Sequence, residues 1–130
     1  MQNKLILGLI VIILFAACKK DKDESEVSLI GKWNVENSIF KIYENGVLID
    51  TETEAGDGTT FDFQDNGNLI IATPGSDVES VPYTIKADSK VEIDGALIEI
   101  RNLTRSNVTL FGRQDYAPGE YDEVFFNLKR

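Results

Sequence analysis

The chain of 130 residues contains no histidine and only one cysteine, Cys18. The lack of histidine removes the commonest general base and the commonest nitrogen ligand for zinc. A single cysteine cannot form a disulfide within the chain. Among the 22 acidic residues, no spacing singles out a catalytic pair of carboxylates. The sequence therefore predicts a protein that is not an enzyme and that has no cofactor and no metal site.

Basic residues are also scarce. The chain has 13 lysines and arginines against 22 acidic residues, which gives a net charge of −9. No lysine and arginine cluster occurs after residue 28. Because a phosphate backbone requires a basic face, we expect no nucleic-acid partner. The acidic balance also disfavours docking on anionic lipid headgroups and favours solubility.

One long hydrophobic run is present, and it lies near the start of the chain. Residues 5–17 are thirteen uncharged, mostly apolar residues that follow Lys4. This length is typical of a signal peptide and too short for a membrane-spanning helix, which needs about 20 apolar residues. Two small residues, Ala16 and Ala17, directly precede Cys18. The pattern predicts a signal peptide over residues 1–17 that is cleaved before Cys18.

The residues Leu14-Phe15-Ala16-Ala17-Cys18 resemble the lipobox of bacterial lipoproteins, with Phe15 where that family more often has leucine or valine. The resemblance implies that Cys18 becomes the mature N-terminus and carries acyl chains such as palmitate. Two long chains give a stable membrane anchor where one does not. The alternative for Cys18 is a buried thiol. We expect a lipid anchor in the outer membrane of a bacterial cell envelope.

Residues 18–28 are strongly charged and almost free of apolar side chains. Such a segment cannot bury enough surface to offset its ordering entropy, so we interpret it as a tether between the lipid and a folded domain. Its charges after the cysteine also resemble the export signals of some surface lipoproteins. The periplasmic face and the outer surface therefore both remain open.

From residue 29 onward, short apolar runs alternate with turn signals, and no stretch has helical periodicity. Residues 81–86 place Val81, Tyr83 and Ile85 on one face, as a half-buried strand does. Asn45-Gly46 and Asp94-Gly95 are typical of tight hairpin turns. The pattern predicts strands over residues 32–43, 47–53, 59–64, 69–73, 80–87, 91–94, 96–103, 107–114 and 121–129.

A nearly unbroken series of hairpins favours a meander that closes on itself, because closure removes exposed sheet edges. We therefore predict an all-β domain over residues 29–130, folded as a small antiparallel up-and-down β-barrel. The predicted inward side chains are almost all large and apolar. They are Trp33, Val35, Ile39, Phe61, Phe63, Leu69, Ile71, Val81, Tyr83, Ile85, Val91, Ile93, Ile98, Ile100, Val108, Leu110, Val124, Phe126 and Leu128.

Gly31 and Trp33 open the first predicted strand, and this Gly-x-Trp resembles the signature of lipocalins and related calycins. The resemblance covers residues 29–130 and implies a lipocalin-like barrel. It also implies that the tryptophan packs across the closed end beneath a cation from the last strand. Arg130 or Lys129 supplies this cation.

The inward set suits either a filled barrel or a hydrophobic pocket at the end away from Trp33. Phe61, Phe63, Tyr83 and Phe126 are the candidate pocket lining. The sequence slightly favours the filled barrel. We therefore expect a membrane-anchored, non-enzymatic envelope lipoprotein with a structural or partner-interaction role. The alternative is a carrier or binder of a small hydrophobic ligand.

Overall fold

The structure, a computed structural model, describes residues 27–130. The predicted signal peptide of residues 1–17, the predicted lipidation site Cys18 and most of the predicted tether lie outside the described residues. No helix within residues 27–130 is long and apolar enough to cross a membrane. The described residues form nine strands: β1 (Gly31–Glu44), β2 (Val47–Ala55), β3 (Thr60–Phe63), β4 (Asn68–Ala72), β5 (Glu79–Lys86), β6 (Lys90–Ile93), β7 (Ala96–Arg101), β8 (Asn107–Ala117) and β9 (Glu120–Lys129).

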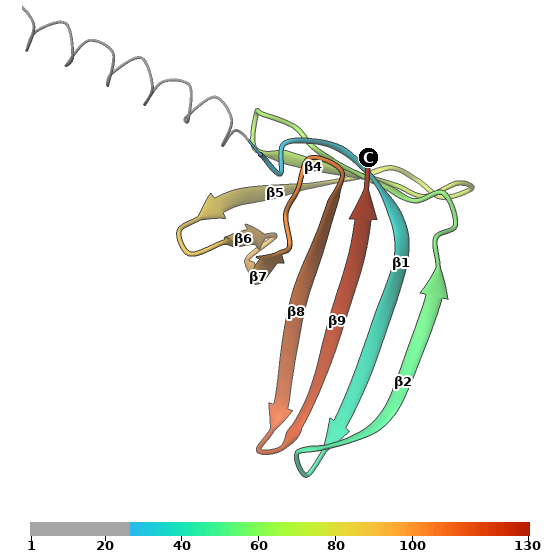
Figure 1. Cartoon of the computed structure of the whole chain (residues 1–130), viewed down its shortest axis with the longest axis vertical. Helices are drawn as coiled ribbons and strands as arrows, with labels where there is room; N and C mark the ends of the chain where they lie inside the picture. Colours follow the sequence, from blue (N-terminus) through green and yellow to red (C-terminus); the bar gives the residue numbers. More distant parts are fainter. Residues whose placement is uncertain (1–26) are drawn as a thin grey trace, which may run out of the picture.

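The strands form one antiparallel sheet that closes into a barrel (Figure 1). From β3 to β9 each strand pairs with the next along the chain, and β9 returns to pair with β1. The closed barrel has eight strands and up-and-down topology. The predicted all-β fold class is thus confirmed. Short turns join most neighbouring strands as hairpins.

β2 and β3 occupy the same side of β1 and together take the place of one barrel strand. Residues 31–34 of β1 pair with β3, and residues 37–44 pair with β2. The chain between them turns at Gly56, whose amide donates to the Glu36 carbonyl oxygen at 2.8 Å. Only β3 continues to β4, and within residues 27–130 no strand pairs with the other edge of β2.

Four strands reach well past the rest of the barrel. β1, β2, β8 and β9 have nine or more residues each, whereas β3, β4, β6 and β7 have four to six. In Figure 1 the long strands continue below the others as a sheet that no opposite wall covers. We call this part, residues 40–52 and 113–123, the flap. At its tip the two hairpin turns are joined by a hydrogen bond from the Gly46 amide to the Gly119 carbonyl oxygen at 3.0 Å.

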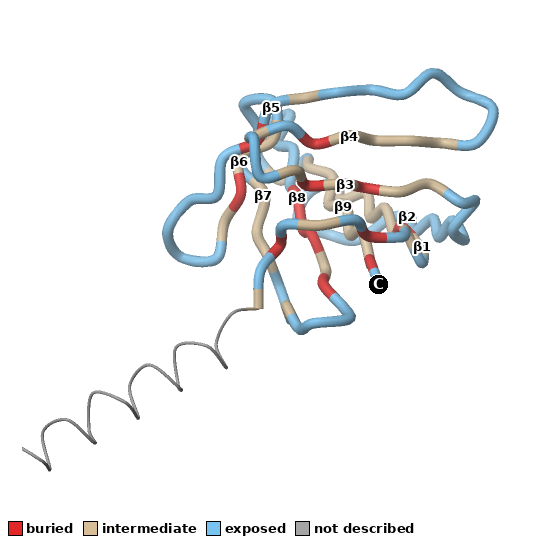
Figure 2. The backbone as a smooth tube through the Cα atoms, turned by 90° about the horizontal axis from the view of Figure 1, so that it is seen from above, coloured by how far each residue is buried: buried red, intermediate tan, exposed pale blue. Residues whose placement is uncertain are grey.

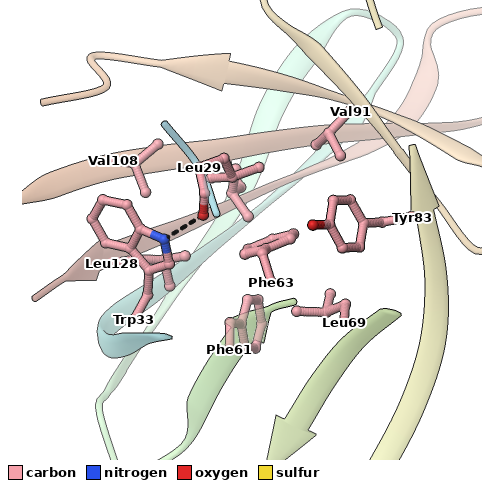
Figure 3. Packing of buried hydrophobic residues seen from close by; sticks show 10 residues of the cluster. Leu29, Trp33, Phe61, Phe63, Leu69, Tyr83, Val91, Val108 and Leu128 are labelled. Atoms are coloured by element: carbon pink, nitrogen blue, oxygen red, sulfur yellow. Dashed lines mark hydrogen bonds between the residues drawn. The ribbon is translucent and has the colours of Figure 1, made fainter. Parts of the chain in front are cut away.

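The core lies at the end of the barrel where β1 begins, which we call the Trp33 end. Ten buried side chains pack together there (Figure 3), and β2 contributes none because all of its residues are exposed (Figure 2). The core consists of Leu29, Trp33, Phe61, Phe63, Leu69, Tyr83, Val91, Val108, Leu110 and Leu128. Predicted inward positions supply all of them except Leu29.

The register of β1 against β9 shifts between Val35 and Asn37, so Glu36 is an extra residue in β1. Such a bulge reverses the faces of all following side chains. Ser38 is therefore buried beside the core, and Ile39 pairs with Phe125 on the outer face. The prediction that Ile39 points into the barrel is wrong, because the bulge interrupts the strict alternation of β1.

Candidate functional site

A cavity of about 260 Å³ lies inside the barrel next to the core. Strands from both walls supply its lining, and no ionisable side chain is among them. The lining residues are Phe61, Leu69, Ile71, Ile93, Ala96, Ile98, Leu110, Gly112, Val124 and Phe126. A concave and almost wholly apolar site of this kind suits a small hydrophobic molecule.

The cavity lies on the flap side of the core. On β8 and β9, the paired residues Val108 and Leu128 belong to the core. The pair Gly112 and Val124 lies further along the same two strands and lines the cavity. The interior is thus filled at the Trp33 end and hollow toward the flap.

Gly112 creates part of this space. A Cβ atom on Gly112 would lie 3.1 Å from Cδ1 of Ile98 and 3.2 Å from Cγ1 of Val124. These distances are tighter than ordinary van der Waals contact, so any larger side chain would take up cavity volume. The absence of a side chain at this inward position keeps the hollow open.

The structure separates the predicted pocket lining into two pairs. Phe61 and Phe126 line the cavity, with ring centroids 5.5 Å apart. Phe63 and Tyr83 do not line it and pack edge-to-face in the core, with centroids 5.1 Å apart (Figure 3). The two pairs lie side by side, one at the cavity and one behind it.

Ala96 and Gly112 are lining residues that were not among the predicted inward positions. Gly112 extends the alternation of Val108 and Leu110, which is the signal that could have placed it inside the barrel. Ala96 directly follows the Asp94-Gly95 turn, and nothing in the sequence distinguishes it as a lining residue.

The Tyr83 side chain ends in a hydroxyl that donates a hydrogen bond to the Gln64 carbonyl oxygen. Burial raises the pKa of Tyr83 above its ordinary value of 10.0, and the nearby charges of Asp65 and Asp62 raise it further. Both causes disfavour the phenolate, so the neutral form stabilises the fold. The side chain anchors the turn after β3 to the core.

We expect Tyr83→Phe to lower the free energy of unfolding at pH 7 by about 1 kcal/mol, because one hydrogen bond is lost. In the wild type, the unfolded chain ionises Tyr83 at a lower pH than the folded chain does. This contribution to stability is complete below pH 10.0 and declines as the pH rises toward the folded-state pKa. Urea unfolding from pH 8 to 11 should therefore show that the free energy of unfolding falls less with rising pH in the variant than in the wild type. Equal losses in both proteins would contradict this assignment.

At the Trp33 end, the Trp33 Nε1 donates to the Leu29 carbonyl oxygen at 2.8 Å (Figure 3). The guanidinium carbon of Arg130 lies 3.9 Å from the Trp33 ring centroid. Arg130 also donates to the carbonyl oxygens of Arg105, Ile30 and Ser28 at 2.8, 2.9 and 3.0 Å. Of the two cations that the resemblance offered, Arg130 is the one over the ring.

Gly31 makes room for this arrangement. Its φ is +125°, and a Cβ atom there would lie 2.7 Å from Nη1 of Arg130. A side chain at this position would therefore strain the backbone and displace the guanidinium. Gly31, Trp33 and Arg130 thus lie together as one packed unit at the end of the barrel opposite the flap.

Comparison with protein-family models, with curated protein sequences and with solved structures finds no match to this chain. The closed eight-stranded antiparallel barrel is compatible with a lipocalin-like fold. Within residues 27–130, no three carboxylate, histidine or cysteine side chains converge in a way that could hold a metal ion. The apolar cavity is large enough to receive a small molecule from solution.

Proposed function

We propose that this protein is a lipocalin-like lipoprotein, anchored in the bacterial outer membrane through Cys18, whose barrel binds a small hydrophobic molecule without chemical conversion. The apolar cavity of about 260 Å³ carries this proposal. Pockets for drug-sized ligands have volumes of roughly 300–1,000 Å³, so the fitting ligand is smaller, such as one short alkyl chain or one ring.

The lining explains how such a ligand is held. Transfer of apolar surface from water into the cavity contributes about 25 cal/mol per Å² of buried area. The aromatic rings of Phe61 and Phe126 and the aliphatic side chains of Ile71, Ile98 and Val124 give contact on several sides. The lining is apolar on all sides, which supports the binding of an apolar molecule.

Ala96→Phe is expected to weaken binding of decanol about tenfold or more, because the added ring takes cavity space. Ala96 is exposed and lines the cavity, so the ring can be accommodated without core strain. Ile85→Phe is the matched control, since Ile85 is 47% exposed at the Trp33 end and does not line the cavity. Titration calorimetry in nanodiscs of zwitterionic lipid measures the affinity of the wild type and of both variants for decanol.

Partition of decanol into the lipid is the same in all three samples, so only cavity binding differs between them. The wild type and Ile85→Phe should agree within about twofold, a difference of less than 0.5 kcal/mol. Equal heats from the wild type and Ala96→Phe would overturn the ligand-binding role.

A structural or partner-interaction role is the second candidate, and the flap favours it. Val47, Leu48, Ile49 and Tyr116 are apolar or aromatic side chains at its far end, with exposed fractions of 61, 45, 51 and 64%. Val47, Leu48 and Ile49 are consecutive in β2, and neighbouring exposed apolar side chains are typical of contact surfaces. If the wild type shows no decanol binding beyond Ala96→Phe, this second role becomes the better explanation.

The proposed anchor is tested by Cys18→Ser. Cells that express the wild-type chain should incorporate labelled palmitate into it, and the variant should carry no label, because the acylated sulfur is gone. Palmitate incorporation into Cys18→Ser at the wild-type level would overturn the anchor.

A further inference from the structure

We propose that the cavity selects a cationic amphiphile, whose apolar part enters the barrel while an amine or quaternary ammonium group stays at the acidic mouth beside the flap. This inference rests on the proposed ligand-binding function and names the class of ligand. It follows from the distribution of charge over the two faces and two ends of the barrel.

The inner face of the flap continues the inner wall of the cavity. Across the sheet, Val124 of β9 is paired with Phe40 of β1, and Phe40 is paired with Glu52 of β2. Paired residues in antiparallel strands share a face, so the Glu52 carboxylate lies on the same face as the cavity-lining Val124. Two strand spacings separate these residues, which is roughly 10 Å. Asp50 lies on this face one row further out, opposite Ile42.

Other carboxylates lie around the same opening. Asp122 is paired with Ile42, next to the row of Val124, and accepts a hydrogen bond from the Tyr116 hydroxyl at 2.8 Å. On the other side of the barrel, Glu79 is the strand partner of the cavity-lining Ile71. Negative charge thus flanks the mouth from both walls.

A groove of about 510 Å³ leads from the cavity onto the flap and shares with it Ala96, Ile98, Gly112 and Val124. Phe40 and Asp122 continue its lining outward, which gives an apolar floor with a carboxylate at its edge. Arg113 also lines this groove. Its guanidinium lies 3.8 Å from the ring centroid of Tyr121 and pairs with Asp115 at 3.0 Å, so its charge is already matched.

Apart from Arg113, the lysines and arginines of residues 27–130 do not line the cavity or this groove. Lys41 is on the outer face of the flap, 5.2 Å from the ring centroid of Phe125. Lys86 lines a groove with Leu29 at the Trp33 end. Within residues 27–130, the lysines and arginines lie at the Trp33 end or on the outer face, and they are Lys32, Lys41, Lys86, Lys90, Arg101, Arg105, Arg113, Lys129 and Arg130.

The physical consequence is a difference between ligands of the same tail and opposite charge. At about 0.1 M salt the Debye length is about 10 Å, so the carboxylates still act on a charge at the mouth. A cationic head is attracted by them and an anionic head is repelled, while the tail gains the same contacts in the cavity. Head-group charge therefore decides affinity among ligands of equal length.

The test compares decyltrimethylammonium, decanol and decanoate on the full chain in zwitterionic nanodiscs, with Ala96→Phe as the blank for lipid partition. At low salt we expect the cation to bind about tenfold more tightly than decanoate, with decanol between them, and the difference to shrink at 1 M salt. The double variant Glu52→Gln with Glu79→Gln should reduce the ratio to about threefold and leave decanol unchanged. The matched control is Asp65→Asn with Asp88→Asn, two turn residues at the Trp33 end, which should keep the tenfold ratio.

The outcomes separate the two proposals. If no probe binds beyond the blank, the ligand-binding function itself fails. If decanol binds beyond the blank but the cation and decanoate bind equally, the function stands and cation selection is wrong. Selectivity that the Glu52 and Glu79 double variant retains in full would also overturn the acidic mouth as its cause.

Discussion

Replacing Gly56 by alanine is expected to lower the free energy of unfolding by about 3 kcal/mol. A Cβ atom at this position would lie 2.1 Å from the carbonyl oxygen of Val35 and 3.0 Å from that of Glu36. Both neighbours are backbone atoms of β1, so no side-chain rotation can relieve the clash. The chain must move away from β1 at the point where β2 gives way to β3.

Two hydrogen bonds depend on this close approach. The Gly56 amide donates to the Glu36 carbonyl oxygen at 2.8 Å, and the Val35 amide donates to that of Thr59 at 3.0 Å. If the segment around Gly56 separates from β1, these backbone groups lose their hydrogen-bond partners. Each group costs about 1–3 kcal/mol when it is left unsatisfied. Because β3 joins β1 to β4, the loss also weakens closure of the barrel.

Chemical denaturation followed by circular dichroism measures this effect. Gly46→Asn is the control, since Gly46 has a φ of +75° and a Cβ atom there would meet nothing within 4 Å. Asparagine tolerates this backbone region, so the control should change stability by less than about 0.5 kcal/mol. A Gly56→Ala protein as stable as the control would contradict the close contact between the two segments.

Trp33→Ala is expected to lower the free energy of unfolding by about 4 kcal/mol, because it opens a large cavity in the core. Trp33 is fully buried, and its Nε1 donates to the Leu29 carbonyl oxygen. Arg130 covers the ring, so part of the cost belongs to the pair. A double-mutant cycle with Arg130→Ala should give a coupling energy of about 1 kcal/mol.

Lys129→Ala provides the matched control for Arg130. The neighbouring lysine is exposed, and within residues 27–130 its side chain takes part in no hydrogen bond or ion pair. Its replacement should change stability by less than about 0.5 kcal/mol and show no coupling to Trp33. Equal coupling of both cations to the ring would show that net charge at this end matters and contact does not.

The strands and their closure could be predicted because they depend on local signals. Alternation such as that of residues 81–86 and turns such as Asn45-Gly46 specify hairpins between neighbours in the chain. The bulge at Glu36 and the turn at Gly56 could not be predicted in the same way. They depend on each other across the sheet, through contacts between residues that are distant in the sequence.

The candidate site was only partly predictable for a related reason. Apolar inward residues such as Phe61 and Phe126 follow from alternation, but a cavity depends on where volume is missing. The small residues Gly112 and Ala96 leave the cavity open, whereas Phe63 and Tyr83 pack against each other and fill the space next to it. The acidic mouth depends on the register of β2 against β1, which is a tertiary feature.

Native mass spectrometry of the wild type and Ala96→Phe, purified side by side without denaturation, tests most directly whether the barrel holds a small apolar molecule. Solvent extraction and analysis then identify whatever was bound. We predict a stoichiometric molecule of low mass on the wild type and none on Ala96→Phe. A wild-type barrel that is empty on isolation and does not take up the decyl probes would contradict the ligand-binding function.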